Sequence, residues 1–213
     1  MALPEPFTTT QQQVVTYDWS DITAGVSYRN FYPAETEDGK VLYSQTTLYA
    51  TNFKEFSIAT NTAFDEDFDI LINEPITING DVIVTFAVIF KNNTASNPTT
   101  ISSDLTVKIR KWDGTTETDL GTATVTASAI IGNTAPNNVT EYTYSFSINV
   151  LNQFIPSGST LRYSIIGTST LDAAKLLYIG RDPANRSSAT IFDPNSSADT
   201  TRTTVSVPIK NTN

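Results

Sequence analysis

Residues 142–150 alternate strictly between apolar and polar side chains, and this pattern constrains the fold more than any other stretch. The apolar members occupy every second position: Tyr142, Tyr144, Phe146, Ile148 and Val150. Successive side chains of a β-strand point to opposite faces, so this period of two predicts a strand with one face in a core and one in water. The chain therefore contains at least one half-buried strand.

Other stretches carry related signals. Residues 105–109 alternate in the same way, and residues 82–90 are almost continuously apolar, which predicts a central strand buried on both faces. Asn79-Gly80 predicts a type I′ hairpin turn, because both central residues of that turn need a positive φ. Together these patterns give about ten strands. We therefore predict an all-β fold, an antiparallel two-sheet β-sandwich that is jelly-roll-like.

The domain organisation follows from where the β pattern begins. Residues 1–13 include two prolines and the run Gln11, Gln12 and Gln13, with little to bury. Such a segment is either a disordered terminus or an extended arm that orders only against a partner, and we expect an extended N-terminal arm. Residues 14–213 show no composition break and no internal repeat, which predicts a single β-sandwich domain.

The chain contains no cysteine and no histidine. Disulfides, thiol nucleophiles, Cys/His metal sites and Ser-His-Asp triads are therefore excluded. The common phosphate-binding, nucleotide-binding and hydrolase motifs are also missing from the sequence. We predict that the protein is not an enzyme and needs no cofactor, although an enzyme that uses carboxylates alone stays open.

The net charge of −9, with an isoelectric point near 4.4, bears on partners. A negative protein repels phosphate backbones and anionic membranes, so we expect no nucleic acid and no membrane as partner. The first residues lack the basic and apolar regions of a signal peptide, and no apolar run reaches the ~18 residues of a membrane helix. We therefore expect folding in the cytoplasm.

The densest acidic run lies just before the clear β pattern and contains Asp65, Glu66, Asp67 and Asp69. Four carboxylates so close together are a weak calcium candidate, since Ca²⁺ takes six to eight oxygen ligands. The spacing is not that of an EF-hand, and the alternative is a solvated strand whose aspartates face water. A glycosidase-type carboxylate pair is a further, less favoured alternative.

Two other places could contact partners. Trp112 lies beside the Asp113-Gly114 turn, where an exposed indole could stack on a sugar ring, although aromatic side chains more often fill cores and interfaces. The loop that carries Arg181, Asp182 and Arg186 has both signs of charge, and its guanidinium groups could bind carboxylates on a partner or pair within the loop.

A family resemblance covers residues 111–186. It rests on five segments in this order: Lys111-Trp112-Asp113-Gly114, Thr122-Ala123-Thr124-Val125, Tyr142-Thr143-Tyr144-Ser145-Phe146, Pro156-Ser157-Gly158-Ser159-Thr160-Leu161-Arg162 and Leu177-Tyr178-Ile179-Gly180-Arg181-Asp182-Pro183-Ala184-Asn185-Arg186. This half of the chain resembles β-sandwich virion proteins of tailed bacteriophages, especially capsid decoration (cement) proteins and related head or tail accessory proteins.

The resemblance implies a jelly-roll-like virion structural protein, often a trimer, that binds the major capsid protein or another virion protein on the outside of the capsid and stabilises the particle. The candidate contacts are then the arm and the loops near residues 181–200. The alternative is a carbohydrate-binding or lectin-like tail module, for which Trp112 would be the sugar-stacking residue.

Overall fold

The computed structural model of the chain describes residues 26–36, 39–44, 55–58, 63–92, 99–131, 139–169, 175–180 and 203–211. The strands in these ranges are β1 (Val26–Thr36), β2 (Gly39–Tyr43), β3 (Glu55–Ile58), β4 (Ala63–Leu71), β5 (Ile76–Asn92), β6 (Thr99–Trp112), β7 (Glu117–Ile131), β8 (Val139–Ile155), β9 (Thr160–Ser169), β10 (Lys175–Gly180) and β11 (Thr204–Asn211). The predicted all-β fold is confirmed. No helix found within these ranges could cross a membrane.

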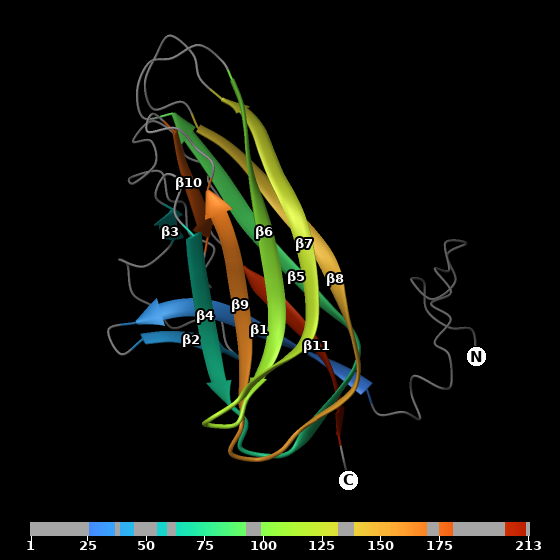
Figure 1. Cartoon of the computed structure of the whole chain (residues 1–213). Helices are drawn as coiled ribbons and strands as arrows, with labels where there is room; N and C mark the ends of the chain where they lie inside the picture. Colours follow the sequence, from blue (N-terminus) through green and yellow to red (C-terminus); the bar gives the residue numbers. More distant parts are fainter. Residues whose placement is uncertain are drawn as a thin grey trace, which may run out of the picture.

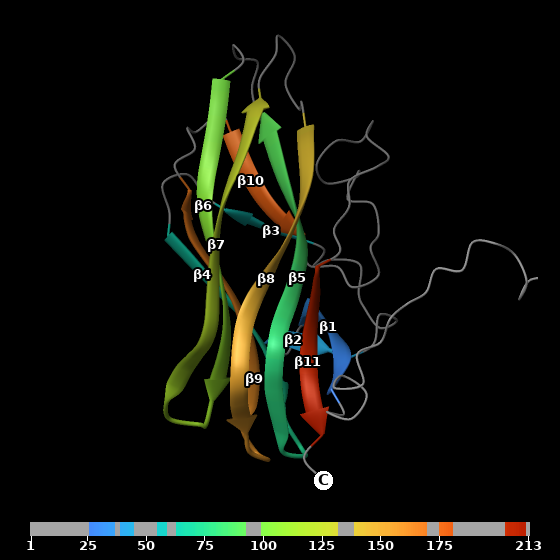
Figure 2. The same cartoon turned by 90° about the vertical axis from the view of Figure 1, so that its right-hand side faces the viewer.

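The strands form one hydrogen-bonded path in the order β3-β10-β5-β11-β1-β2-β4-β9-β6-β7, and β8 pairs with the other edge of β5. The path turns at β1, whose first part (residues 26–31) pairs with β11 while its second part (residues 32–36) pairs with β2. The result is a strongly curled sheet that forms a half-barrel (Figures 1 and 2). We call its two portions the β5 side (β3, β10, β5, β8, β11) and the β9 side (β2, β4, β9, β6, β7).

This architecture differs from the prediction of two separate antiparallel sheets. Strand β1 belongs to both sides, so the sides are joined by backbone hydrogen bonds. The β2–β4 contact is parallel and rests on one registered pair, Val41 with Asp69. At the other end of the path, β7 and β8 lie against each other, yet no backbone ladder joins them in the described residues, so the barrel stays open there.

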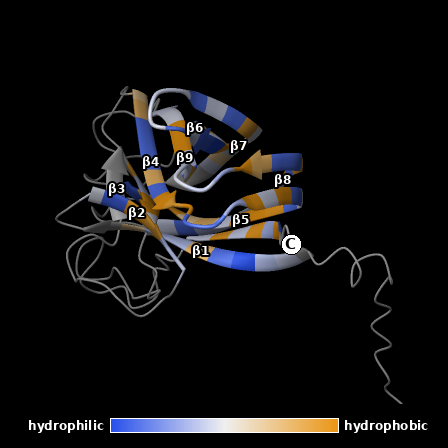
Figure 3. Cartoon of the chain, turned by 90° about the horizontal axis from the view of Figure 1, so that it is seen from below, coloured by the Kyte–Doolittle hydropathy of each residue, from blue (hydrophilic) through white to orange (hydrophobic). Residues whose placement is uncertain are grey.

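One hydrophobic core fills the curl and draws side chains from both sides. Hydrophobic positions lie along strands of both sides in Figure 3. The alternation at residues 142–150 is confirmed, because Ile148 and Val150 are buried and Phe146 packs edge-on against Phe86. Burial decreases toward the start of β8, where Tyr142 is exposed. The two-faced burial predicted for residues 82–90 is found from Phe86 onward.

The Asn79-Gly80 prediction is wrong. Strand β5 runs through this dipeptide, which lies opposite a β-bulge of β8 where the register between the two strands shifts. Gly80 has a φ of +130°, and Asn152 on the opposite strand has a φ of 49°. The backbone N–H of Asn152 donates to Asn79 Oδ1 at 3.2 Å. Glycine adopts a positive φ readily, both in hairpin turns and at irregular positions of strands. The dipeptide therefore correctly indicated a positive φ, but this φ occurs within a strand and not in a turn.

Candidate functional site

The outer surface of the β9 side carries a network of ionised side chains across four neighbouring strands. Inward-facing residues such as Phe68, Ile109 and Tyr163 fill the core, so the alternate positions on the same strands point outward. The register then brings together the members of what we call the outer charged network: Asp65, Asp67 and Asp69 from β4, Arg162 and Ser164 from β9, Lys108 and Arg110 from β6, and Glu117 and Asp119 from β7.

Arg110 is the centre of this network. Its side chain is only 7% exposed although it lies on an outer surface. The guanidinium Nε donates to Asp119 Oδ1 at 3.0 Å, and Nη1 lies 3.2 Å from Glu117 Oε2 and donates to Ser164 Oγ at 3.1 Å. Ser164 in turn donates to Asp67. A charge this poorly hydrated must be paired, and Arg110 is paired on several sides.

Arg162 is held in a similar way. Its Nε and Nη2 donate to the two oxygens of Asp69 at 2.7 and 2.8 Å, and its Nη1 donates to Glu117 at 2.8 Å. The Arg162 guanidinium carbon also lies 5.5 Å from the ring centre of Trp112. The hydrogen bonds that Arg162 donates to Asp69 raise the pKa of Arg162 further above its already high value. These groups satisfy one another, so the network has little left to offer a ligand.

The four predicted calcium ligands do not lie on one face of β4. Asp65, Asp67 and Asp69 face outward into the network, whereas Glu66 faces the opposite way and pairs with Lys40. In the part of the chain that the structure describes, no group of acidic side chains is arranged to hold a metal ion. Burial raises the pKa of Asp65, and the charge of Asp67 raises it further. Because side chains alternate along β4, Glu66 lies on the face opposite to the three aspartates. The four carboxylates therefore do not form the calcium site that the sequence indicated.

The remaining predicted contacts have different outcomes. Trp112 is partly buried and faces outward, but the Arg162 guanidinium covers one face of its indole, which limits stacking on a sugar. Gln11, Gln12, Gln13, Arg181, Asp182 and Arg186 lie outside the described residues, and those predictions stay untested.

The outer surface of the β5 side has the opposite character. Four large apolar side chains are 41 to 60% exposed on it, and we call them the outer apolar face: Tyr28, Ile83, Leu151 and Phe154. The Tyr28 hydroxyl reaches over β11 and donates to the carbonyl oxygen of Asp81 on β5 at 3.2 Å. The carboxylate of Asp81 accepts a hydrogen bond from the Asn149 amide at 2.8 Å. The face thus spans β1, β5 and β8.

Sequence reasoning missed this face, although part of its signal was present. Leu151 stands at a position that the alternation of residues 142–150 assigns to the outer surface. Phe154 would face inward on the same alternation, but the bulge at Asn152 shifts the phase by one. Ile155 is therefore buried and Phe154 is exposed. The exposure of Leu151 could have been predicted by extending the alternation. The exposure of Phe154 depends on the bulge, which the sequence pattern does not show.

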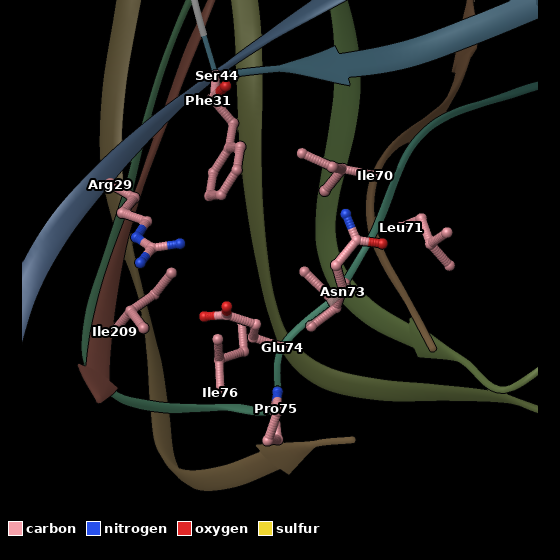
Figure 4. A pocket seen from close by; sticks show the side chains of 11 residues that line it. Arg29, Phe31, Ser44, Ile70, Leu71, Asn73, Glu74, Pro75, Ile76 and Ile209 are labelled. Carbon is pink, nitrogen blue, oxygen red and sulfur yellow. The ribbon is translucent and has the colours of Figure 1, made fainter. Parts of the chain in front are cut away.

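A hollow of about 710 Å³ opens at the end of the curl, beneath the place where β1 crosses between the sides (Figure 4). The buried side chains of Phe31, Ile72, Ile76 and Ile209 contribute to its lining. Arg29 from β1 and Glu74 from the turn between β4 and β5 point into the hollow (Figure 4). The hollow is the third feature of the molecule that could take part in binding.

Comparison with known proteins shows likeness in fold only. No family model and no curated protein matches the chain. Among solved structures, a CocE/NonD family hydrolase from Staphylococcus aureus has a TM-score of 0.50 at 9% identity, covering 88% of this chain and 37% of that one. An aminopeptidase from a marine sediment archaeon (Thaumarchaeota) has a TM-score of 0.54 at 11% identity, with coverages of 87% and 37%.

An α-amino acid ester hydrolase is similar to the same degree, with a TM-score of 0.53 and 11% identity over 85% of this chain and 36% of that one. The chain therefore spans little more than a third of the length of these hydrolases. A chain of infectious bursal disease virus also aligns, but its TM-score of 0.24 carries no argument. The prediction that the protein is not an enzyme is corrected, because the three solved structures described above, with TM-scores of 0.50 to 0.54, are hydrolases; at 9 to 11% identity they share the fold alone.

Proposed function

We propose that the chain is a structural protein of a virus particle, and that it binds the shell protein through the outer apolar face. The observation that carries this proposal is the group of large apolar side chains, 41 to 60% exposed, on one side of the sheet. Exposed apolar surface that gathers on one face is a common mark of a protein-binding site. The family resemblance of residues 111–186 supports a capsid decoration protein as the specific identity.

The mechanism proposed is passive stabilisation. Burying the exposed half of a leucine or phenylalanine side chain against a partner contributes about 1 kcal/mol, so four such residues together provide a useful part of a binding energy. A homo-oligomer, with a trimer favoured, would multiply the contacts that each assembly makes. A jelly-roll-like sandwich, the finer form of the predicted fold, belongs to the same proposal.

The experiment compares particles that carry different variants. Leu151→Asp and Phe154→Asp each place a charge in the outer apolar face, and Thr122→Asp places the same charge at an exposed position of β7 on the other side. Mass spectrometry of purified particles counts the copies of the chain. We expect hundreds of copies for the wild type and for Thr122→Asp, and a loss of at least ten-fold for the other two. Equal occupancy for all variants would contradict the proposal.

A second candidate is that the chain itself catalyses hydrolysis. The likeness to three hydrolases over 85–88% of this chain favours it. The test measures hydrolysis of p-nitrophenyl acetate and leucine p-nitroanilide by the purified chain. A rate that rises with the amount of chain and disappears in urea supports this candidate. A rate equal to that of buffer counts against it.

A further inference from the structure

The hollow beneath β1 combines an apolar floor with one positive and one negative side chain. Phe31, Ile72, Ile76 and Ile209 are core residues that line the hollow, each with at most 7% of its surface exposed. Its volume of about 710 Å³ lies within the range of roughly 300–1,000 Å³ that is common for ligand pockets. The floor favours an apolar body in whatever occupies it.

Arg29 is unusual for its position. In the β1–β11 register it lies opposite Val207, a core residue, so the backbone directs the Arg29 side chain toward the inner side of the curl. The strand leaves the core at this end, and the guanidinium therefore enters the hollow and not the packed interior (Figure 4). Arg29 is exposed, so water hydrates its guanidinium, and a ligand would replace those contacts with its own.

Glu74 supplies the opposite charge from the turn between β4 and β5. Within the residues that the structure describes, neither Arg29 nor Glu74 makes an ion pair or a side-chain hydrogen bond. This distinguishes the two residues from Arg110 and Arg162, whose donors are already taken by carboxylates. With respect to the described part of the chain, the hollow thus offers an exposed guanidinium and an exposed carboxylate that are not paired, above an apolar floor.

We propose that this hollow binds a short apolar peptide as a zwitterion, with its carboxylate at Arg29 and its amino group at Glu74. A ligand of one charge sign would meet one attraction and one repulsion, whereas a zwitterion meets two attractions. The apolar side chains of the peptide cover the floor, and the polar side chains of Asn73 and Ser44 at the edge suit its amide groups. This site is separate from the outer apolar face and goes beyond the proposed function.

The test matches changes in the ligand with changes in the protein. The probes are trileucine, N-acetyl-trileucine and trileucine amide, which differ only in their end charges. The proteins are the wild type, Arg29→Gln, Glu74→Gln and the control Lys210→Gln, which removes an exposed cation from the outer surface of β11. Binding is followed by NMR shifts of the labelled full chain, which also report whether each variant is folded.

We expect trileucine to give saturable shifts at residues that line the hollow. Each end cap should weaken binding to the wild type and to Lys210→Gln by roughly three- to ten-fold, as expected for a charge-assisted hydrogen bond at a partly exposed site. Arg29→Gln should bind trileucine and its amide equally, and Glu74→Gln should bind trileucine and its acetyl form equally.

Three outcomes would overturn the proposal: no saturable shifts with trileucine, equal binding of all three probes to the wild type, or capping effects that survive in both glutamine variants. None of these results depends on virus particles, so failure here is distinct from failure of the proposed function.

Discussion

Replacing Arg110 with methionine removes the centre of the outer charged network while keeping a side chain of similar length. Arg110 is 7% exposed and contacts Asp119, Glu117, Asp67 and Ser164 at 3.0 to 3.5 Å. Removing one partner of a buried ion pair costs about 3–5 kcal/mol. The carboxylates here are 30 to 45% exposed, so water compensates part of this loss. We therefore expect Arg110→Met to lower the free energy of unfolding by about 2–3 kcal/mol.

Two comparison variants separate geometry from charge. Arg110→Lys keeps the charge but loses the planar fork of donors, so we expect a loss of about 1 kcal/mol. Lys108→Met removes a more exposed cation with a single contact to Asp119 at 2.6 Å, and we expect a loss below about 1 kcal/mol. Urea unfolding followed by circular dichroism gives the three values. If Arg110→Met costs no more than Lys108→Met, the network does not stabilise the fold in the way its geometry indicates.

The remaining predictions concern single groups. A hydrogen bond from Lys108 is the largest cause of the lowered pKa of Asp119. The stability that the ionised Asp119 contributes is therefore present above the ordinary pKa of about 3.9 and is lost as the pH falls from there through the lowered pKa. Urea unfolding should show that Asp119→Asn destabilises the protein less at pH 3 than at pH 7. Asp65 has a raised pKa, chiefly from burial, so the wild type should gain stability relative to Asp65→Asn over the same fall in pH. The Tyr163 hydroxyl is fully buried without a hydrogen-bond partner in the described residues, so Tyr163→Phe should raise the urea midpoint by the equivalent of about 1 kcal/mol, and an equally large decrease would reveal a partner. A methyl at Gly121 would lie 2.5 Å from an Ile148 methyl, so Gly121→Ala should cost about 1–3 kcal/mol in thermal or urea unfolding, against less than about 0.5 kcal/mol for the exposed Thr122→Ala.

The local β pattern could be predicted because it depends on neighbours in the sequence. The period of two at residues 142–150 gave the correct inner face, and the Asp113-Gly114 turn joins β6 to β7 as expected. In that turn Asp113 Oδ1 accepts hydrogen bonds from the backbone N–H groups of Thr115 and Thr116. A short polar side chain and a glycine with a φ of +98° form this turn without help from distant residues.

Features that depend on strand pairing could not be predicted in this way. Asn79-Gly80 lies within a strand and not in a hairpin turn because β8 pairs along β5 on both sides of it, with its bulge opposite the dipeptide, and only the partner strand reveals this. The outer charged network joins residues as far apart in sequence as Asp67 and Ser164, and the acidic run alone gave no sign of its arginines. The crossing of β1 between the two sides likewise rests on its pairing with β11 and β2, near opposite ends of the chain.

The two outer surfaces of the curled sheet are therefore not equivalent as binding sites. On the β9 side, Arg110 and Arg162 already make several charge-assisted hydrogen bonds each, and a partner would have to break these before forming its own. On the β5 side, Ile83, Leu151 and Phe154 lose nothing but contact with water when a partner covers them. For the partner proposed above, binding at β5 and β8 would therefore cost less desolvation than binding at the charged surface of the β9 side.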